Sequence, residues 1–551
     1  MSLDRLFDRL GRMPFVKIAL LFAAGIALTD AFVWPLWFTA GAFVVSGALA
    51  LLFRSQSAAA MSLDRLFDRL GRMPFVKIAL LFAAGIALTD AFVWPLWFTA
   101  GAFVVSGALA LLFRSQSAAA VLLMAAGAGA AQLHERPPTA PRGVHTLFEL
   151  HVDEAVFRRE GYTAAEATLA AWRDPASGRW HPSGDRVRLY ADSTLALAGG
   201  ERIRCRGVVR PLAGGERYRR QMTRRGVVGS LRLGQRQILG QLPAARGSLH
   251  RRAVERIGRL GLGDEADAVV RAMTAGDRSR IPAELREAYA RSGLAHLLAL
   301  SGLHTGILFV AVNAALWWLP LVRYGHRWRN LLAVAAVWTF VAAAGFPASA
   351  VRAAAMCTLL QTALATSSEY DGLNALGTAA FGMLLWNPAW LHDVGFRLSV
   401  AAVAGILAWG VPLARRLRTG RRWIDAPVAS LVVSAAATLA TAPLVAHAFG
   451  RIPLAGIVVT PAALLPAGAV VACGALWLLL PLPPLAWLLR PAAALSVAAL
   501  DTLCRTADAW PGAAVEQSLS DRGVALAYLL FALATAAAWC VEPKKSVHLP
   551  S

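Results

Sequence analysis

The chain has 551 residues and a mass of 58.5 kDa; 57% of its residues are hydrophobic and only 16% are charged. A mean hydropathy of +0.52 excludes an ordinary soluble protein, so most of the chain is expected to lie in a lipid bilayer. The 55 Lys and Arg outnumber the 33 Asp and Glu, and the resulting net charge of +22 predicts an anionic partner, either lipid headgroups or nucleic acid.

The front of the chain contains a perfect repeat, because residues 1–60 and 61–120 are identical at every position. Evolved repeats diverge, since each copy packs against different neighbours. We therefore interpret the repeat as a recent duplication or a gene-assembly error, with the native start at Met61. The first copy supplies two apolar spans, Phe15–Val33 and Trp37–Phe53. A basic start followed by further spans predicts an anchor helix rather than a cleaved signal peptide.

Residues 61–133 predict an N-terminal transmembrane segment with three spans, which begin near Phe75, Trp97 and Ala118. A span needs about 20 apolar residues to cross about 30 Å of hydrocarbon. Basic residues lie before the first span and after the second, which predicts that these ends are cytoplasmic. These residues are Arg65, Arg69, Arg72, Lys77 and Arg114. The chain is then expected to reach the outer side near His134.

Residues 134–247 are polar and predict a small extracytoplasmic β-barrel of the OB-like kind. Five short segments alternate apolar and polar residues, with Gly and Pro between them: HTLFELHVDEAVF, AAEATLAAW, DRVRLYAD, ERIRCRGVVR and GVVGSLRLG. Residues 134–260 contain 24 Arg against 12 Asp and Glu. Long translocated domains escape the positive-inside rule, so this charge is compatible with the outer location.

Arginines on this domain are the candidate contacts for DNA. Three of them alternate with other residues along one segment, which places three guanidiniums on one face of a strand, and five more follow closely. The candidates are Arg202, Arg204, Arg206, Arg217, Arg219, Arg220, Arg224 and Arg225. Such a stripe fits a phosphate backbone, and it equally fits a solvated face or anionic lipid headgroups. Aromatic interleaving, which favours single strands, is limited to Tyr218.

The second half of the chain predicts an amphipathic helical segment at 248–292, a multi-span membrane domain at 293–542 and a tail at 543–551. The expected spans are Leu294–Leu319, Leu331–Phe346, Val351–Ala365, Leu373–Leu391, Val400–Pro412, Val428–Ala446, Leu454–Leu480 and Val524–Val541. Several are short or broken by Pro347, Pro388, Pro461 and Pro466. Interrupted helices at membrane depth are typical of transporters and channels.

Polar residues inside an apolar run make residues 272–309 the most informative segment. Ser301, Gly302 and His304 follow His296 within the apolar run. Polar groups at membrane depth need partners, and ionisable ones mark functional sites by default. The alternative is helix packing, in which Gly302 permits close approach and Ser301 bonds across helices.

Three blocks of this region resemble the ComEC/Rec2 family of competence proteins. The first holds Gly276, Asp277, His296, Ser301, Gly302, Leu303 and His304. The second, GFPASAVRAAAM, holds Gly345, Ser349, Arg352 and Met356. The third holds Asn387, Pro388, Asp393, Gly395, Phe396, Leu398 and Ser399. The chain departs from the family pattern at Thr305, at Arg397, where Gln is usual, and at Thr460, where the family's Asn is missing.

The resemblance implies a polytopic α-helical membrane protein with an inserted extracytoplasmic OB-like domain, of the short form without a metallo-β-lactamase-like domain. It implies an inner-membrane channel that brings single-stranded transforming DNA into the cytoplasm. The implied pathway residues are Asp277, His296, Ser301, Gly302, His304, Gly345, Ser349, Arg352, Asn387, Pro388, Asp393 and Ser399. Arg352 and Arg397 would offer positive charge along it.

The implied partners are single-stranded DNA, membrane lipid, a cytoplasmic helicase-like motor, single-strand-binding proteins, a periplasmic DNA receptor and a separate nuclease. Homo-oligomerisation is left open. Asp277, Arg278 and Asp393 also fit interfacial anchors or a structural ion pair, and Asn387-Pro388 also fits a helix end.

No metal, cofactor or enzymatic activity is predicted. The eleven His show no HxHxDH spacing, and no GxxxxGK[ST] phosphate loop occurs. The five Cys form no CxxC pair, which argues against a disulfide framework and a cysteine zinc site. They are Cys205, Cys357, Cys473, Cys504 and Cys540.

Two rival functions stay open at the level of sequence. One is an intramembrane serine hydrolase with Ser301 as nucleophile and His304 as base, since side chains three residues apart on a helix can meet. The other is a small-molecule or lipid transporter whose basic periplasmic domain docks anionic headgroups.

Overall fold

The computed structural model describes residues 71–541, with gaps at 72, 93, 114, 135–138, 160–161, 193–194, 196–199, 214, 216–218, 220–221, 224–225 and 243–248. The chain divides into two units, and the account below concerns the unit Arg72–Thr535. The expectations for the first repeat copy, Met61, the basic residues at 65–72 and 114, four of the candidate arginines (217, 220, 224 and 225), Tyr218 and the tail therefore lie outside the described residues.

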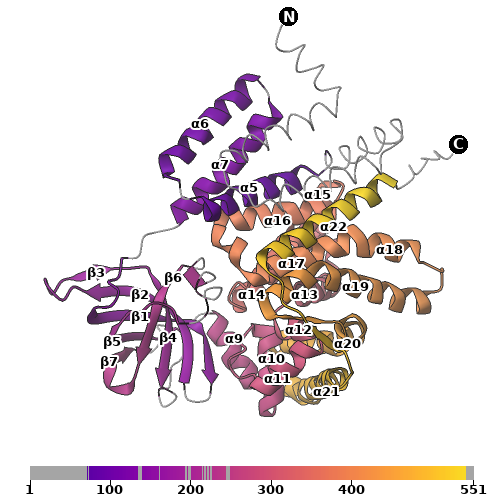
Figure 1. Cartoon of the computed structure of the whole chain (residues 1–551). Coiled ribbons are helices and arrows are strands. Elements are labelled where there is room, and N and C mark those ends of the chain that lie inside the picture. Colours follow the sequence, from indigo (N-terminus) through magenta and orange to yellow (C-terminus); the bar gives the residue numbers. More distant parts are fainter. Residues whose placement is uncertain are drawn as a thin grey trace, which may run out of the picture. The chain divides into compact units, whose positions relative to one another are not determined.

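The N-terminal segment forms three helices, as the sequence predicts: α5 (Pro74–Ala91), α6 (Leu96–Phe113) and α7 (Gln116–His134) (Figure 1). Glycines let α5 and α7 approach closely. A Cβ at Gly85 would lie 2.0 Å from the Met124 carbonyl oxygen, and one at Gly127 would lie 2.1 Å from that of Phe82. Small residues at such crossings are the usual device of membrane helix packing.

The polar domain is a seven-stranded sheet, and all five predicted segments form strands of it. The strands are β1 (His145–Arg159), β2 (Tyr162–Arg173), β3 (Trp180–Pro182), β4 (Arg186–Asp192), β5 (Arg202–Val208), β6 (Val227–Leu233) and β7 (Ile238–Leu242). They hydrogen-bond in the order β6-β4-β2-β1-β5-β7, with β3 added beside β2, and the 3-10 turn η1 (Gln235–Gln237) precedes β7 (Figure 1).

The number of strands corrects the prediction of five. β3 has three residues, all exposed, so it carries no alternation. In the strands that were predicted, one face is buried: Phe148, Leu169, Leu189 and Cys205 are all 0% exposed. Among the described residues β6 and β7 are the ends of the pairing order, and no strand pairing joins them. A closed OB-like barrel is therefore not confirmed.

The predicted amphipathic segment, 248–292, contains three helices in its described residues: α9 (Leu249–Gly258), α10 (Asp264–Ala275) and α11 (Ala283–Arg291). α10 is buried from Asp267 to Ala275 and packs against α20 and α21. Inside it Arg271 pairs with Asp267 at 2.6 Å, which balances both buried charges. The next helix, α12 (Ala295–Leu298), is a single turn.

The membrane domain continues as a series of helices with short connections. They are α13 (Gly302–Ala315), η2 (Leu319–Leu321), α14 (Gly325–Ala343), α15 (Ala348–Thr366), α16 (Gly372–Trp386), η3 (Pro388–His392), α17 (Val394–Gly405), the π-turn η4 (Ile406–Gly410), α18 (Val411–Arg416), α19 (Arg422–Phe449), α20 (Gly456–Leu479), α21 (Pro483–Asp508) and α22 (Asp521–Val541). A two-stranded sheet pairs β8 (Arg451–Pro453) with β9 (Ala514–Glu516).

Three expectations for this domain are wrong. The run 294–319 is not one helix, because the chain is extended at Ala299 and α13 begins after Ser301. Pro461 and Pro466 do not break a helix but lie inside α20. α21 was not predicted, because Arg490, Asp501 and Arg505 interrupt its apolar sequence.

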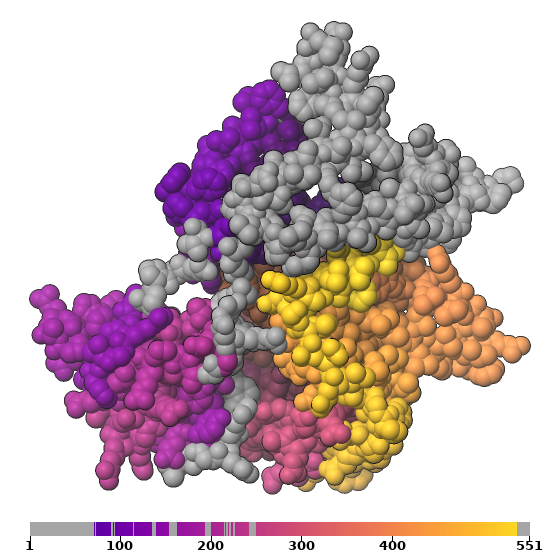
Figure 2. Space-filling model, in the orientation of Figure 1, coloured from indigo at the N-terminus to yellow at the C-terminus, as the bar shows by residue number. Residues whose placement is uncertain are grey.

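Eight helical segments of the described chain are long and apolar enough to cross a membrane: Leu96–Phe113, Gln116–His134, Gly302–Leu321, Ala348–Thr366, Val394–Arg416, Arg422–Phe449, Gly456–Leu479 and Pro483–Asp508. Large apolar side chains stand on their surfaces, among them Leu111 (83% exposed) and Leu465 (84%). Figure 2 shows the same view with all atoms, with α18 and α19 in orange and α22 in yellow. The protein is thus a multi-pass membrane protein with a sheet domain.

Candidate functional site

Ser301 begins α13 and forms a reciprocal cap with His304. The Ser301 side-chain oxygen accepts a hydrogen bond from the His304 backbone N–H at 3.4 Å, and the Ser301 N–H donates to His304 Nδ1 at 3.4 Å. The carbonyl of Leu300, just before this break, accepts from the Ser349 hydroxyl of α15. Polar side chains therefore satisfy the backbone groups freed where the helix is interrupted.

His304 is fully buried at the first turn of α13, with 0% exposure. Because Nδ1 accepts a hydrogen bond, the proton of the neutral ring lies on Nε2, which is then a donor. Within the described part of the chain, Nε2 has no partner that meets hydrogen-bond geometry. The backbone carbonyl of Met273 on α10 faces the ring outside those limits, and a buried ionisable ring among apolar helices is a candidate functional group.

Arg352 is buried in the first part of α15, at 5% exposure, and joins three helices. Its Nε donates to the Ser399 hydroxyl of α17 at 2.8 Å, and Nη1 lies 3.5 Å from the Met356 sulfur. A Cβ on Gly302 would lie 2.4 Å from Arg352 Nη2, so glycine at this position of α13 leaves room for the guanidinium. No carboxylate among the described residues pairs with Arg352.

The structure thus brings together residues of all three sequence blocks. Six of the predicted pathway residues meet where α13, α15 and α17 begin: Ser301, Gly302, His304, Ser349, Arg352 and Ser399. We call this group the junction cluster. It combines one buried cation, one buried imidazole and three hydroxyls among apolar helices, which is a set of polar groups suited to an anionic group.

Asp277, Gly345 and His296 occupy turns and a short helix rather than the junction cluster. The Asp277 carboxylate accepts a hydrogen bond from the Ser279 N–H at 2.9 Å. The Asp277 N–H donates to the carbonyl of Arg271 in α10. Gly345 has φ 77 and forms the tight turn before α15, a left-handed conformation that favours glycine. His296 is exposed on α12 and bonds the Gly293 carbonyl through Nδ1 at 2.9 Å.

Asn387, Pro388 and Asp393 lie at helix ends. Asn387 accepts from the Ala389 N–H at 3.0 Å and caps η3, with Pro388 at its first position. Asp393 accepts from the Phe396 N–H at 2.9 Å and caps α17. These side chains set the direction of the chain toward Ser399, in line with the alternative that they end and begin helices.

The Ser301–His304 geometry does not support a serine hydrolase. The imidazole nitrogen bonds the Ser301 backbone N–H, whereas the hydroxyl of Ser301 receives the backbone N–H of His304. A nucleophile–base pair requires the ring nitrogen to bond the hydroxyl itself. In this structure the two residues act as a helix cap.

Sequence reasoning missed a second polar contact between α13 and α15. Gln361, at 3% exposure, donates through Nε2 to Asn313 Oδ1 at 3.0 Å. Asn313 lies eleven residues after Gly302, about 16 Å further along α13. The signal was present, because an amide inside an apolar helix needs a partner, but no resemblance drew attention to these two positions.

The Arg stripe of the sheet domain is confirmed as a face of β5. Arg202, Arg204 and Arg206 are exposed, while the residues between them are buried. Arg219 is also exposed. Arg204 forms an ion pair with Glu149 on β1, so its charge is partly balanced. Burial raises the pKa of Cys205, which lies on the opposite face, to about 12.

No metal centre is found among the described residues, where no three His, Cys, Asp or Glu side chains gather to hold an ion.

Comparison with known proteins agrees with the three sequence blocks. The family model described as "Competence protein" matches residues 273–542, which include the whole junction cluster. ComE operon protein 3 of Bacillus subtilis (strain 168) is 32% identical over 139 residues. That match covers 25% of this chain and 17% of the relative, far less than two thirds of the relative's length. No solved structure matches the chain significantly. Residues 273–542 thus match the competence protein family, which is consistent with the resemblance to ComEC/Rec2.

Proposed function

We propose that this protein is a channel of the bacterial inner membrane that passes one strand of transforming DNA into the cytoplasm. The observation that carries the proposal is the burial of Arg352 at the junction of α13, α15 and α17, without an acidic partner among the described residues. It lies within the part of the chain that matches the competence family.

The energetics of Arg352 favour an anionic substrate. A guanidinium buried among apolar helices loses its hydration, and no described carboxylate offsets that cost for Arg352. Ser399 and Gly302 fix the direction of the guanidinium rather than neutralise it. A passing phosphate can accept charge-assisted hydrogen bonds from such a group, which Arg forms better than Lys.

The helix bundle has two ends. We call the end that holds the junction cluster the motif end, and the opposite end, where exposed arginines gather, the basic end. α13, α15 and α17 all begin at the junction cluster, so the segments that follow α13 and α18 lie at the opposite end of the bundle. Those segments carry exposed arginines: Arg323, Arg327, Arg415, Arg416, Arg418, Arg421 and Arg422. α16 begins at the same basic end, and there its Asn374 accepts from the Phe75 N–H of α5.

The positive-inside rule then gives the orientation that we propose. The basic end is cytoplasmic, together with the start of α5, and the junction cluster and the sheet domain are extracytoplasmic. Exposed Trp317, Trp318 and Trp423 lie near the basic end, where indole rings favour the membrane interface. DNA would thus meet the junction cluster before it crosses toward the arginine-rich loops.

Transport in this direction requires work. Each negative charge that enters a cell with a negative interior is opposed by about 2.3 kcal/mol per 100 mV. We therefore propose a cytoplasmic helicase-like motor and single-strand-binding proteins that trap the product. A periplasmic receptor would deliver DNA, and a separate nuclease would remove the other strand.

Deletion of the gene followed by a transformation assay tests the function. Loss of transformants that carry a chromosomal marker is expected, with recovery upon complementation by the form that begins at Met61. Normal transformation of the deletion strain would contradict the proposal. A lipid or small-molecule transporter would give that result.

A further inference from the structure

An exposed tryptophan lies on the basic face of the sheet domain, on the strand that the sequence did not predict. Trp180 begins β3 and is 40% exposed, although indole is one of the most apolar side chains. Its partner on β2 is Arg173. The neighbouring residue His181 points to the other face, where its ring stacks on Trp172 at 4.8 Å.

Arg204 contacts the Trp180 ring from one side, and Glu149 in turn holds Arg204. The guanidinium carbon of Arg204 lies 5.5 Å from the ring centroid, within the range of a cation–π contact. Arg204 is itself held by Glu149, through both Nε at 3.0 Å and Nη2. The indole is therefore oriented by a fixed cation while much of its surface stays open to water.

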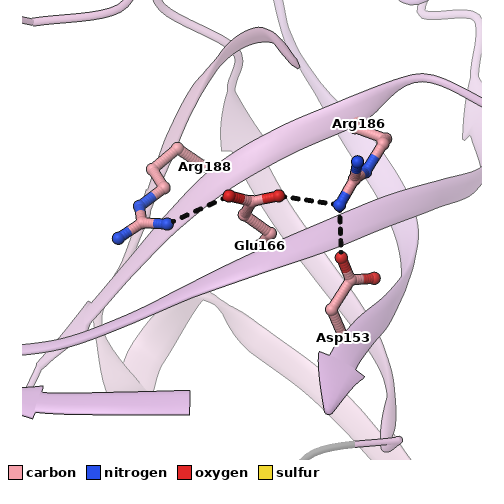
Figure 3. Close-up of polar contacts among 4 residues, drawn as sticks. All are labelled: Asp153, Glu166, Arg186 and Arg188. Atoms are coloured by element: carbon pink, nitrogen blue, oxygen red, sulfur yellow. Dashed lines mark hydrogen bonds and ion pairs between the residues drawn. The ribbon is translucent and has the colours of Figure 1, made fainter. Parts of the chain in front are cut away.

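The arginines beside Trp180 carry charge that the sheet does not balance. Arg202 and Arg206 flank Arg204 on the exposed face of β5, each about 7 Å along the strand. A second group of charges on the sheet is compensated: Figure 3 shows Arg186 between Asp153 and Glu166, and Glu166 also pairs with Arg188. Among the described residues, Arg202 and Arg206 therefore place positive charge without an ion-pair partner on the strand beside the indole.

We propose that Trp180 is a stacking platform for a base of single-stranded DNA, with phosphates bound by Arg202 and Arg206. This inference rests on the proposed function and adds the strand type and the residue that selects it. An open aromatic face among backbone-binding cations is the arrangement that sequence-tolerant single-strand binders use, because every base has a π-face to stack. A duplex keeps its bases stacked on one another and offers no such face to Trp180.

The test is binding of a fluorescein-labelled oligothymidylate to the full chain, purified in detergent, by fluorescence anisotropy. We expect Trp180→Ala to raise Kd about 5- to 100-fold, the equivalent of one lost base stack, and Trp180→Phe to retain most of the affinity. Trp510→Ala is the matched control, because Trp510 is 42% exposed but lies outside the sheet domain; it should bind as the wild type does.

Salt dependence separates stacking from charge. Trp180→Ala should leave the slope of log Kd against log salt unchanged, whereas Arg202→Ala and Arg206→Ala should each reduce it by about 0.7. A duplex of equal length should show no effect of Trp180→Ala. Wild-type affinity in Trp180→Ala would overturn the platform and leave the proposed function intact. Absence of oligothymidylate binding by the full chain at low salt, with binding to anionic vesicles, would count against both.

Discussion

At the residue scale, the function proposed here depends on how a buried arginine is held. Arg352 donates a hydrogen bond to Ser399 on α17, and its guanidinium occupies the space where a side chain at Gly302 would lie. The sequence indicated each of these residues through its block, since polar groups in apolar helices stand out. It could not predict that they meet, because residues 302, 352 and 399 are joined only by the packing of three helices.

Substitution of Gly302 tests this packing. In Gly302→Ala the new methyl group would lie 2.4 Å from Arg352 Nη2, so the guanidinium must move. Overpacking of this kind costs about 1–3 kcal/mol. We expect transformation frequency to fall at least tenfold. Gly306→Ala, on the same helix with no atom within 4 Å, should be neutral. Equal transformation frequencies in the two variants would show that the Gly302–Arg352 contact is unimportant.

At the element scale, alternation and apolar length predict most strands and helices, and the exceptions have physical reasons. The strand β3 is too short and exposed to alternate, and the charges of α21 hide its apolar face. The break before α13 is invisible in composition, because Leu297–Leu300 is as apolar as a helix interior. Only the cap formed by Ser301 with His304 defines where α13 begins.

Close packing of α5 on α7 is the first element-scale prediction. Ala at Gly127 would place Cβ 2.1 Å from the Phe82 carbonyl oxygen, which cannot yield without moving the helix. In the form that begins at Met61, Gly127→Ala should lower the thermal midpoint of the purified protein by several degrees. Gly129→Ala on the same helix, with nothing within 4 Å, provides the control. An unchanged midpoint for Gly127→Ala would argue against this crossing.

The second element-scale prediction concerns the ion-pair network of the sheet domain. Glu166 accepts from Arg186 at 2.7 Å and Arg188 at 3.3 Å, and its side chain is 13% exposed. Glu166→Gln removes the negative charge that both arginines share, and we expect the free energy of unfolding to fall by about 1–3 kcal/mol. Asp153→Asn, which weakens only the more exposed link to Arg186, should cost less. Denaturant titration of the full chain, monitored by limited proteolysis of the sheet domain, measures both variants. A wild-type unfolding midpoint for Glu166→Gln would show that the network does not stabilise the domain.

At the scale of the whole molecule, the proposed orientation rests on contacts between segments and not on any single span. The strand pair β8–β9 joins the end of α19 to the segment before α22, so both lie at the motif end. The sequence predicted a cytoplasmic start from its basic residues alone. The hydrogen bond between Phe75 and Asn374 links that start to the end of the membrane domain where the arginine-rich loops lie.

Cysteine labelling in intact cells tests this orientation. Ser368→Cys, in the exposed loop between α15 and α16, should resist a membrane-impermeant maleimide until the cells are opened. Pro511→Cys, exposed before β9, should react at once. The native Cys205 contributes little background, since burial raises its pKa to about 12 and leaves the thiol neutral. The opposite labelling pattern would invert the proposed topology.

The most direct measurement of the central claim is uptake of labelled DNA, divided into surface-bound and DNase-protected cytoplasmic fractions. His304→Ala and Arg352→Ala should each abolish the protected fraction while the bound fraction stays at the wild-type level, with Gly306→Ala as a competent control. Wild-type amounts of protected DNA in both variants, at equal protein levels, would contradict a route past the junction cluster.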